Sequence, residues 1–196
     1  MNWWYVKVFF IFGSVLLFCI IFLRDDHTGE HITYYEDGKI EERGYYVDGY
    51  KDGMWTRYRK YGNIFSEGNY VLGKRQGIWV FNDLSGKKDR EETYADGKRN
   101  GRCIFFHEKG NKVLEGDYKD DMKEGKWIGY DWSGEIKFEG NYREGKKEGK
   151  WIHYRRYYKE ERKIVKIEIY KRGKVIKEMD CHRNPEDCNE EKLLIY

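Results

Sequence analysis

Glycine recurs every 24 residues along most of this 196-residue chain. A fixed interval of about 20–50 residues is the signature of a repeat array, in which one small unit is copied and stacked on its neighbours. The sequence therefore predicts an extended array. The positions in this register are Gly29, Gly53, Gly77, Gly101, Gly125, Gly149 and Gly173.

Other residue types keep the same interval. The position two residues after the leading glycine is Trp55, Trp79, Trp127 or Trp151, with His31 and Cys103 as the exceptions. Tyrosine forms a column at Tyr46, Tyr70, Tyr94, Tyr118 and Tyr142. A second glycine column contains Gly38, Gly62, Gly86, Gly110 and Gly134, and a third contains Gly44, Gly68, Gly116 and Gly140, with Glu92 as its exception. We interpret Cys103 as a replaced tryptophan.

Each unit holds two short aromatic-rich stretches separated by turn residues. In the unit that begins at Gly125, the stretches are 126–130 and 136–142, with Ser133-Gly134 and Glu144-Gly145 at the two turns. Such a pattern is typical of a β-hairpin, since Gly and Asp-Gly supply the positive φ of tight turns. The fold class predicted is all-β, an extended antiparallel meander of repeated β-hairpins.

The third glycine column falls inside a strand, where glycine is normally unfavourable. A missing side chain lets a ring from the neighbouring strand lie across the backbone. We therefore expect Gly140 to receive the ring of Trp127 or Trp151. Composition supports a thin sheet, because charged residues make up 37% of the chain while aromatic residues reach 18%.

The first residues follow a different pattern. No charge occurs from Val8 to Leu23, and 3–23 would span about 31 Å as a helix, enough to cross a bilayer. We predict an uncleaved N-terminal signal anchor, with one transmembrane helix, the N-terminus inside and the repeats extracytoplasmic. A cleaved signal peptide would need small residues at its cleavage site, and the sequence has none there. A lipoprotein modified at Cys19 would need a small residue before the cysteine, where this chain has the bulky Phe18. Both stay as alternatives.

The repeat register fails after Trp151. We place an insertion near 155–162 and align Gly173 with the turn in the middle of a unit. The predicted domains are a membrane anchor at 1–26, hairpin repeats at 27–154, a divergent final hairpin at 155–180 and a C-terminal cap or tail at 181–196. Asn184, Pro185 and Glu186 have the order of a short helix start.

The segment 125–148 reads G-K-W-I-x-Y followed by S-G-E-I-x-x-E-G-N-Y-x-x-G-K-K-E. It resembles the bacterial MORN-variant repeat, and the YwqK-type family in particular, over about 30–177. The resemblance implies a hairpin array without catalytic residues of its own. It also implies two roles, because YwqK-type members are labelled antitoxins of toxin–antitoxin systems and the wider MORN class is associated with membrane tethering, scaffolding and acidic lipids.

No enzyme motif occurs in the sequence. The five histidines form no H-E-x-x-H, no G-x-S-x-G is present, and no Gly-Lys pair precedes Ser or Thr as a phosphate loop requires. We expect no enzyme activity, no cofactor and no metal site. Cys181 and Cys188 have a spacing that permits a disulfide in an oxidising compartment, while zinc bound by them with His182 is the weaker alternative.

The remaining candidates are interaction surfaces. One is the aromatic row, since aromatic residues dominate binding hot spots: Trp55, Trp79, Trp127, Trp151, Tyr70, Tyr118 and Tyr142. The other is a basic segment that could contact anionic lipid, or could be the solvated face of the last hairpin: Arg155, Arg156, Lys163, Lys166, Lys171 and Arg172. We expect a membrane-anchored, non-enzymatic module for a protein partner, with a toxin as one candidate. The net charge of +3 does not favour nucleic acid.

Overall fold

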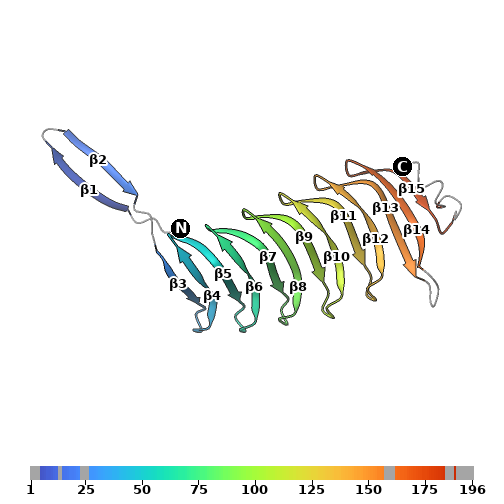
Figure 1. Cartoon of the computed structure of the whole chain (residues 1–196), viewed down its shortest axis with the longest axis horizontal. Coiled ribbons are helices and arrows are strands. Elements are labelled where there is room, and N and C mark those ends of the chain that lie inside the picture. Colours follow the sequence, from blue (N-terminus) through green and yellow to red (C-terminus); the bar gives the residue numbers. More distant parts are fainter. Residues whose placement is uncertain (1–4, 13–14, 23–26, 157–161, 184–187, 189–196) are drawn as a thin grey trace.

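A computed structural model describes residues 5–12, 15–22, 27–156, 162–183 and 188. Its main body is one 13-stranded antiparallel sheet in which every strand lies beside its neighbour in the sequence (Figure 1). This confirms the predicted all-β meander. The strands are β3 (Gly29–Tyr34), β4 (Ile40–Val47), β5 (Tyr50–Tyr58), β6 (Ile64–Val71), β7 (Lys74–Asn82), β8 (Lys88–Ala95), β9 (Lys98–Phe106), β10 (Lys112–Lys119), β11 (Met122–Tyr130), β12 (Ile136–Arg143), β13 (Lys146–Arg156), β14 (Arg162–Lys171) and β15 (Lys174–Asp180).

The N-terminal segment stands apart from this sheet. The backbones of β1 (Tyr5–Phe12) and β2 (Val15–Phe22) pair as a separate antiparallel ribbon. Residues 1–4, 13–14 and 23–26 and the side chains of 5–22 lie outside the described part, so the predicted helix over 3–23 is not tested. Within the parts of the chain that the structure describes, no helical segment has the length and apolar character that a membrane crossing requires.

From Gly53 to Gly149, the leading glycine of each unit lies in a β-bulge. On β10, Glu115 faces Ile128 and Asp117 faces Glu124, so residues 125–127 of β11 stand opposite Gly116 alone. Gly125 has φ +65°, a left-handed conformation that side-chain-bearing residues adopt at a cost. The same register shift recurs at the corresponding step of the other units. The bulge brings each tryptophan back over the preceding strand, which explains the fixed distance between glycine and tryptophan.

Each tryptophan lies flat on a glycine of the third column. A Cβ added to Gly116 would lie 2.3 Å from Cδ2 of Trp127, and the same relation joins Gly44 to Trp55, Gly68 to Trp79 and Gly140 to Trp151. Of the two rings expected over Gly140, that of Trp151 is therefore the one present. Each indole Nε1 donates a 3.1 Å hydrogen bond to the carbonyl of the residue after its glycine.

Tyrosines and cations complete this packing. The ring of Tyr142 stands almost perpendicular to Trp127 and Trp151, with centroids 5.8 and 5.1 Å away. The ammonium of Lys123 lies 4.1 Å from the Trp127 ring centroid, and Lys51, Arg75 and Lys147 cover the other indoles in the same way. A single-layer sheet thus builds its own core, a ladder of alternating Trp and Tyr rings between glycine backbone and cationic side chains.

The ladder is interrupted where both partners change together. Glu92 replaces the glycine, Cys103 replaces the tryptophan, and the two face each other across β8 and β9. The carboxylate of Glu92 occupies this buried site and accepts a 2.7 Å hydrogen bond from the Tyr94 hydroxyl. Burial and the Glu92 charge raise the pKa of the Cys103 thiol to about 12. The buried residues accordingly separate into one cluster before Cys103 and another that begins with it.

The last hairpin corrects one alignment. Tyr154 pairs with Ile164, ten positions later, whereas Tyr130 pairs with Ile136, six positions later, so four residues are inserted in the predicted region. The N–H of Gly173 donates to the carbonyl of Lys147, as that of Gly145 donates to Lys123. Gly173 therefore lies in a turn between units, and its alignment with the mid-unit turn was wrong, because the insertion shifts the register by four.

Candidate interaction surfaces

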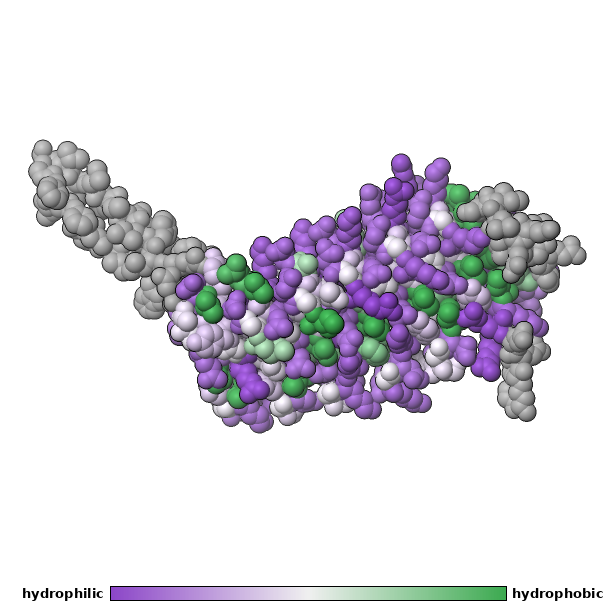
Figure 2. All heavy atoms as spheres, in the orientation of Figure 1, coloured by the Kyte–Doolittle hydropathy of each residue, from purple (hydrophilic) through white to green (hydrophobic). Residues whose placement is uncertain are grey.

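The aromatic row is the core of the sheet. Trp55, Trp79, Trp127 and Trp151 expose between 0% and 3% of their surface, and Tyr118 exposes 8%; Tyr70 and Tyr142 are partly buried against them. These side chains meet one another as the repeat predicts, but the indoles offer no exposed area for a partner. Figure 2 shows one face of the molecule as mainly hydrophilic, with separate apolar patches.

The structure does not bring the six basic candidates together. Arg155 and Arg156 lie at the mid-unit end of the last hairpin, whereas Lys171 and Arg172 lie at its other end. Those ends are roughly 30 Å apart, since β14 has ten residues. Lys166, between them, pairs with Glu168 at 2.7 Å and Glu178 at 3.2 Å, and Lys163 also has an interaction. The basic segment is therefore two separate clusters.

A cleft of about 390 Å³ lies at the mid-unit end. The insertion creates part of its wall, because it extends β13 and β14 by the pairs Arg155–Lys163 and Arg156–Arg162. Trp132, in the turn before β12, is 77% exposed at the same cleft. The lining residues that matter below are Tyr130, Trp132, Tyr154, Arg155, Arg156 and Arg162.

Ionic contacts hold part of the cleft wall in place. The guanidinium of Arg162 lies 4.1 Å from the Tyr154 ring centroid, and the Tyr154 hydroxyl donates a 2.6 Å hydrogen bond to Glu139. Burial and Glu139 raise the pKa of Tyr154 to about 12, so this hydroxyl remains a donor. Arg156 pairs with Glu135 at 3.5 Å. Within the described ranges Arg155 has no ion pair.

His107 closes the cleft behind Trp132. The two rings meet edge to face with centroids 4.6 Å apart. The His107 Nδ1 accepts a 2.8 Å hydrogen bond from the Lys109 N–H, so in the neutral ring the proton is on Nε2. That Nε2 is buried and has no hydrogen-bond partner in the described part of the chain. This ring contact fixes the position of Trp132.

The sequence candidates included Arg155 and Arg156 but missed the rest of the cleft. A signal was present, because Trp132 stands outside the tryptophan column, in a turn where the other units have Glu36, Lys60, Leu84 and Glu108. Arg162 could not be placed, since it lies within the predicted insertion.

Two buried carboxylates stabilise the array from within. Burial alone would raise the pKa of Glu168, but hydrogen bonds from Lys166, His153 and Tyr170 outweigh it and lower the pKa to about 2. Glu115 is held in the same way by Lys112, Tyr130 and Arg102, and its pKa is also about 2. Both carboxylates are therefore ionised throughout the physiological range.

A pH dependence of stability follows. Because the folded pKa lies below the unfolded value of about 4.3, each carboxylate contributes stability above about pH 4.5, and this is lost as the pH falls towards 2. We expect Glu168→Gln to lower the free energy of unfolding by about 1–3 kcal/mol at pH 7 and by much less at pH 2. Urea titrations at both pH values measure this; an equal loss at both would contradict the assignment.

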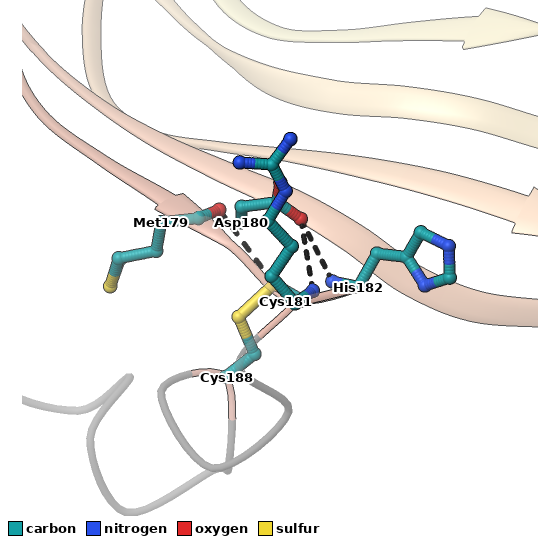
Figure 3. Close-up of a disulfide and its surroundings, with 6 residues drawn as sticks. Met179, Asp180, Cys181, His182 and Cys188 are labelled. Carbon is teal, nitrogen blue, oxygen red and sulfur yellow. Dashed lines mark hydrogen bonds and ion pairs between the residues drawn. A yellow bond between two sulfur atoms is a disulfide. The ribbon is translucent and has the colours of Figure 1, made fainter.

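The cysteine pair closes the last strand. Cys181 and Cys188 are joined by a disulfide (Figure 3). Cys181 is buried with Ile167, Ile169 and Met179, and the Asp180 carboxylate accepts the N–H of His182 (Figure 3). The helix start expected at 184–186 lies outside the described residues. Over the residues described, no group of three or more His, Cys, Asp or Glu side chains is arranged to hold a metal ion.

Comparison with known families identifies part of this array. Residues 28–48 match the family described as MORN repeat variant. No curated protein matches the chain significantly. The matched segment covers β3 and β4, and β5–β6, β7–β8, β9–β10 and β11–β12 repeat its pairing with the same shift near the mid-unit turn. The hairpin that matches the MORN repeat variant thus has the same strand pairing as the four hairpins that follow it.

Proposed function

We propose that the chain is a non-enzymatic, membrane-anchored scaffold whose cleft binds a protein partner. The cleft carries this proposal. Trp, Tyr and Arg are the residues that most often dominate protein interfaces, and Trp132, Tyr130 and three arginines gather here around an accessible hollow. Among the tryptophans that the structure describes, the ladder indoles are buried and Trp132 is exposed, so Trp132 is the one of these that a partner can reach.

The membrane anchor is proposed from the uncharged stretch 8–23, and the extracytoplasmic placement from the flanking charges. The disulfide between Cys181 and Cys188 supports the second point, because disulfides persist in oxidising compartments. The arginines favour a partner with an acidic surface.

Crosslinking in the native membrane tests the proposal. With a photoreactive residue at Lys137, which lines the cleft, we expect a reproducible protein adduct of the full-length chain. Trp132→Ser or Arg155→Glu should reduce its yield about tenfold or more, as loss of a hot-spot residue does. Arg143→Glu, an exposed charge on β12 outside the cleft lining, is the matched control. Absence of an adduct, or one insensitive to both cleft variants, would contradict the proposal.

Two narrower roles are proposed as alternatives. Resemblance to the YwqK-type family supports an antitoxin or immunity role, in which the partner is a toxin; deletion of this protein would then be tolerated only when the neighbouring toxin gene is also removed. The arginine cluster of the cleft supports binding of anionic lipid. In that case the chain from Glu30 to Tyr196 should float with anionic liposomes at low salt, and Arg155→Glu should abolish flotation.

A further inference from the structure

The tight turns between units share one backbone geometry and differ in side chain. The first central residue of each has a left-handed conformation with φ between 49° and 51°: Asp48, Leu72, Asp96, Asp120, Glu144 and Arg172. Leu72 is the apolar member, and it is 62% exposed.

Leu72 is unfavourable here on two counts. Left-handed φ costs a residue with a Cβ about 1–2 kcal/mol, and Asp or Asn reduces this cost by local hydrogen bonding, which leucine cannot do. An exposed leucine also keeps its apolar surface in water. The Leu72 N–H donates a 3.4 Å hydrogen bond to the Asp52 carboxylate, as the N–H at this position donates to a side chain in other turns, so the backbone of the turn is supported. The exposed leucine side chain adds nothing to that support, and this points to a role outside the folding of the chain.

Leu72 belongs to an apolar patch made by the first two of these turns. Val71 is 50% exposed, and Val47 and Tyr50 of the preceding turn are 36% and 40% exposed. The two turns touch, since a Cβ on Gly73 would lie 3.2 Å from the Tyr50 ring. We call Val47, Tyr50, Val71 and Leu72 the apolar turn patch.

Most of the later turns carry charge at the same positions. Val47 and Val71 correspond to Ala95, Lys119, Arg143 and Lys171, and Leu72 corresponds to Asp96, Asp120, Glu144 and Arg172. Exposed apolar side chains also occur beside later turns, at Met122, Val175 and Ile176. The first two turns differ in having Val47, Val71 and Leu72 at positions that the repeat does not require to be apolar.

The apolar turn patch lies where the chain enters the sheet from its N-terminal segment. The Gly49 N–H donates a 3.0 Å hydrogen bond to the His27 carbonyl, and the Asp48 N–H donates to Thr28 Oγ1 at 3.0 Å. In Figure 1 these turns lie along the upper edge of the sheet, at the end of the strands where β3 begins. The uncharged stretch 8–23 ends four residues before His27.

We propose that the apolar turn patch rests in the interfacial layer of the bilayer that holds the N-terminal anchor. This rests on the proposed anchor. Valine and leucine would bury apolar surface among the lipid headgroups and upper acyl chains, and Tyr50 has the amphipathic ring that favours this depth. The later charged turns stay in water, so the array leans on the membrane by its first two hairpins and projects the cleft end away from it.

A polarity-sensitive fluorophore tests the contact in the full-length protein reconstituted into phosphatidylcholine–phosphatidylglycerol vesicles. The label is placed by Leu72→Cys, with Glu144→Cys, at the same turn position three units later, as the matched control. The parent chain gives the background from its own cysteines. We expect emission at 72 to shift to shorter wavelength and to be quenched by nitroxide lipids, and emission at 144 to remain that of a water-exposed label.

The outcomes separate this inference from the anchor. Carbonate-resistant retention in vesicles with an unshifted label at 72 would overturn the contact and leave the anchor standing. Release of the chain by carbonate would overturn both. A shift at 72 that grows with protein density and is insensitive to nitroxide lipids would indicate a second protein copy and overturn the contact.

A second variant tests whether Leu72 contributes to lipid contact or to the stability of the fold. Leu72→Asp gives this turn the residue found at Asp48, Asp96 and Asp120. With the label at Val47→Cys, we expect the substitution to reduce the lipid quenching while the thermal midpoint stays equal or rises. A lowered midpoint with unchanged quenching would show that Leu72 serves the fold, and would overturn the proposal.

Discussion

Gly116→Ala is expected to lower the free energy of unfolding by about 3 kcal/mol or more. Three indole atoms of Trp127 lie 2.3–2.5 Å from the position of the new Cβ. The Trp127 ring cannot shift to relieve this clash. The Lys123 ammonium lies 4.1 Å from the ring centroid on the outer side, and the ring Nε1 donates a hydrogen bond to the Asp117 carbonyl. Urea unfolding of the full-length chain measures the loss.

Gly110→Ala is the matched control for this substitution. Gly110 lies in the turn of the same hairpin, with φ +85° and no atom within 4 Å of an added Cβ. An alanine at this position therefore costs only the free energy of placing a residue with a Cβ in a left-handed conformation, about 1–2 kcal/mol. Equal losses at the two glycines would show that steric contact with Trp127 is not what selects Gly116.

Trp127→Ala is expected to lower the free energy of unfolding by about 3–5 kcal/mol, because a fully buried ring is removed and a cavity remains. The change also removes the edge-to-face contacts with Tyr118 and Tyr142, at 5.3 and 5.8 Å. In a repeat array each unit contacts only its neighbours. Hydrogen exchange should therefore rise mainly in β9–β12.

Trp132→Ala tests the contrast between the two tryptophans, which lie five residues apart. Trp132 is 77% exposed and outside the ladder, so its loss should change the free energy of unfolding by no more than about 0.5 kcal/mol. A comparable loss from both substitutions would contradict the division between ladder and cleft tryptophans.

Periodicity predicted the fold well because each structural requirement is imposed on every unit. A glycine under an indole leaves the same mark at Gly44, Gly68, Gly116 and Gly140, and the turns repeat likewise. The leading glycine was harder to explain, since a bulge with positive φ at Gly125 cannot be distinguished in sequence from a turn. Departures from the repeat were informative but ambiguous. Glu92 replaces a glycine and Cys103 replaces a tryptophan, and only the pairing of β8 with β9 reveals that the two replacements are coupled.

The sequence analysis missed most residues of the two proposed interaction surfaces for a related reason. Positions that repeat are those that the fold requires in every unit. Residues that bind a partner need not occur in every unit. Trp132 and Leu72 each occur once in their columns, and Arg162 depends on an insertion that breaks the register. The row expected to bind a partner is the row that the sheet buries, because a single layer has no other material from which to build a core.

This division has a consequence for function. The ladder side chains pack and hydrogen-bond within the sheet and make the array rigid. Exposed positions can therefore change without affecting the fold. The two non-repeating surfaces lie at opposite ends of the strands, with the apolar turn patch at the end where β3 begins and the cleft at the other end. The proposed scaffold would use this arrangement to hold its partner away from the membrane.

The central claim is that the glycine and tryptophan columns interlock, and a double-mutant cycle on Gly116 and Trp127 tests it most directly. If the clash is the cause of the loss, Gly116→Ala should lower the free energy of unfolding by about 3 kcal/mol in the native background and by less than about 0.5 kcal/mol once Trp127→Ala has removed the ring. Equal losses from Gly116→Ala in the two backgrounds would contradict the interlock.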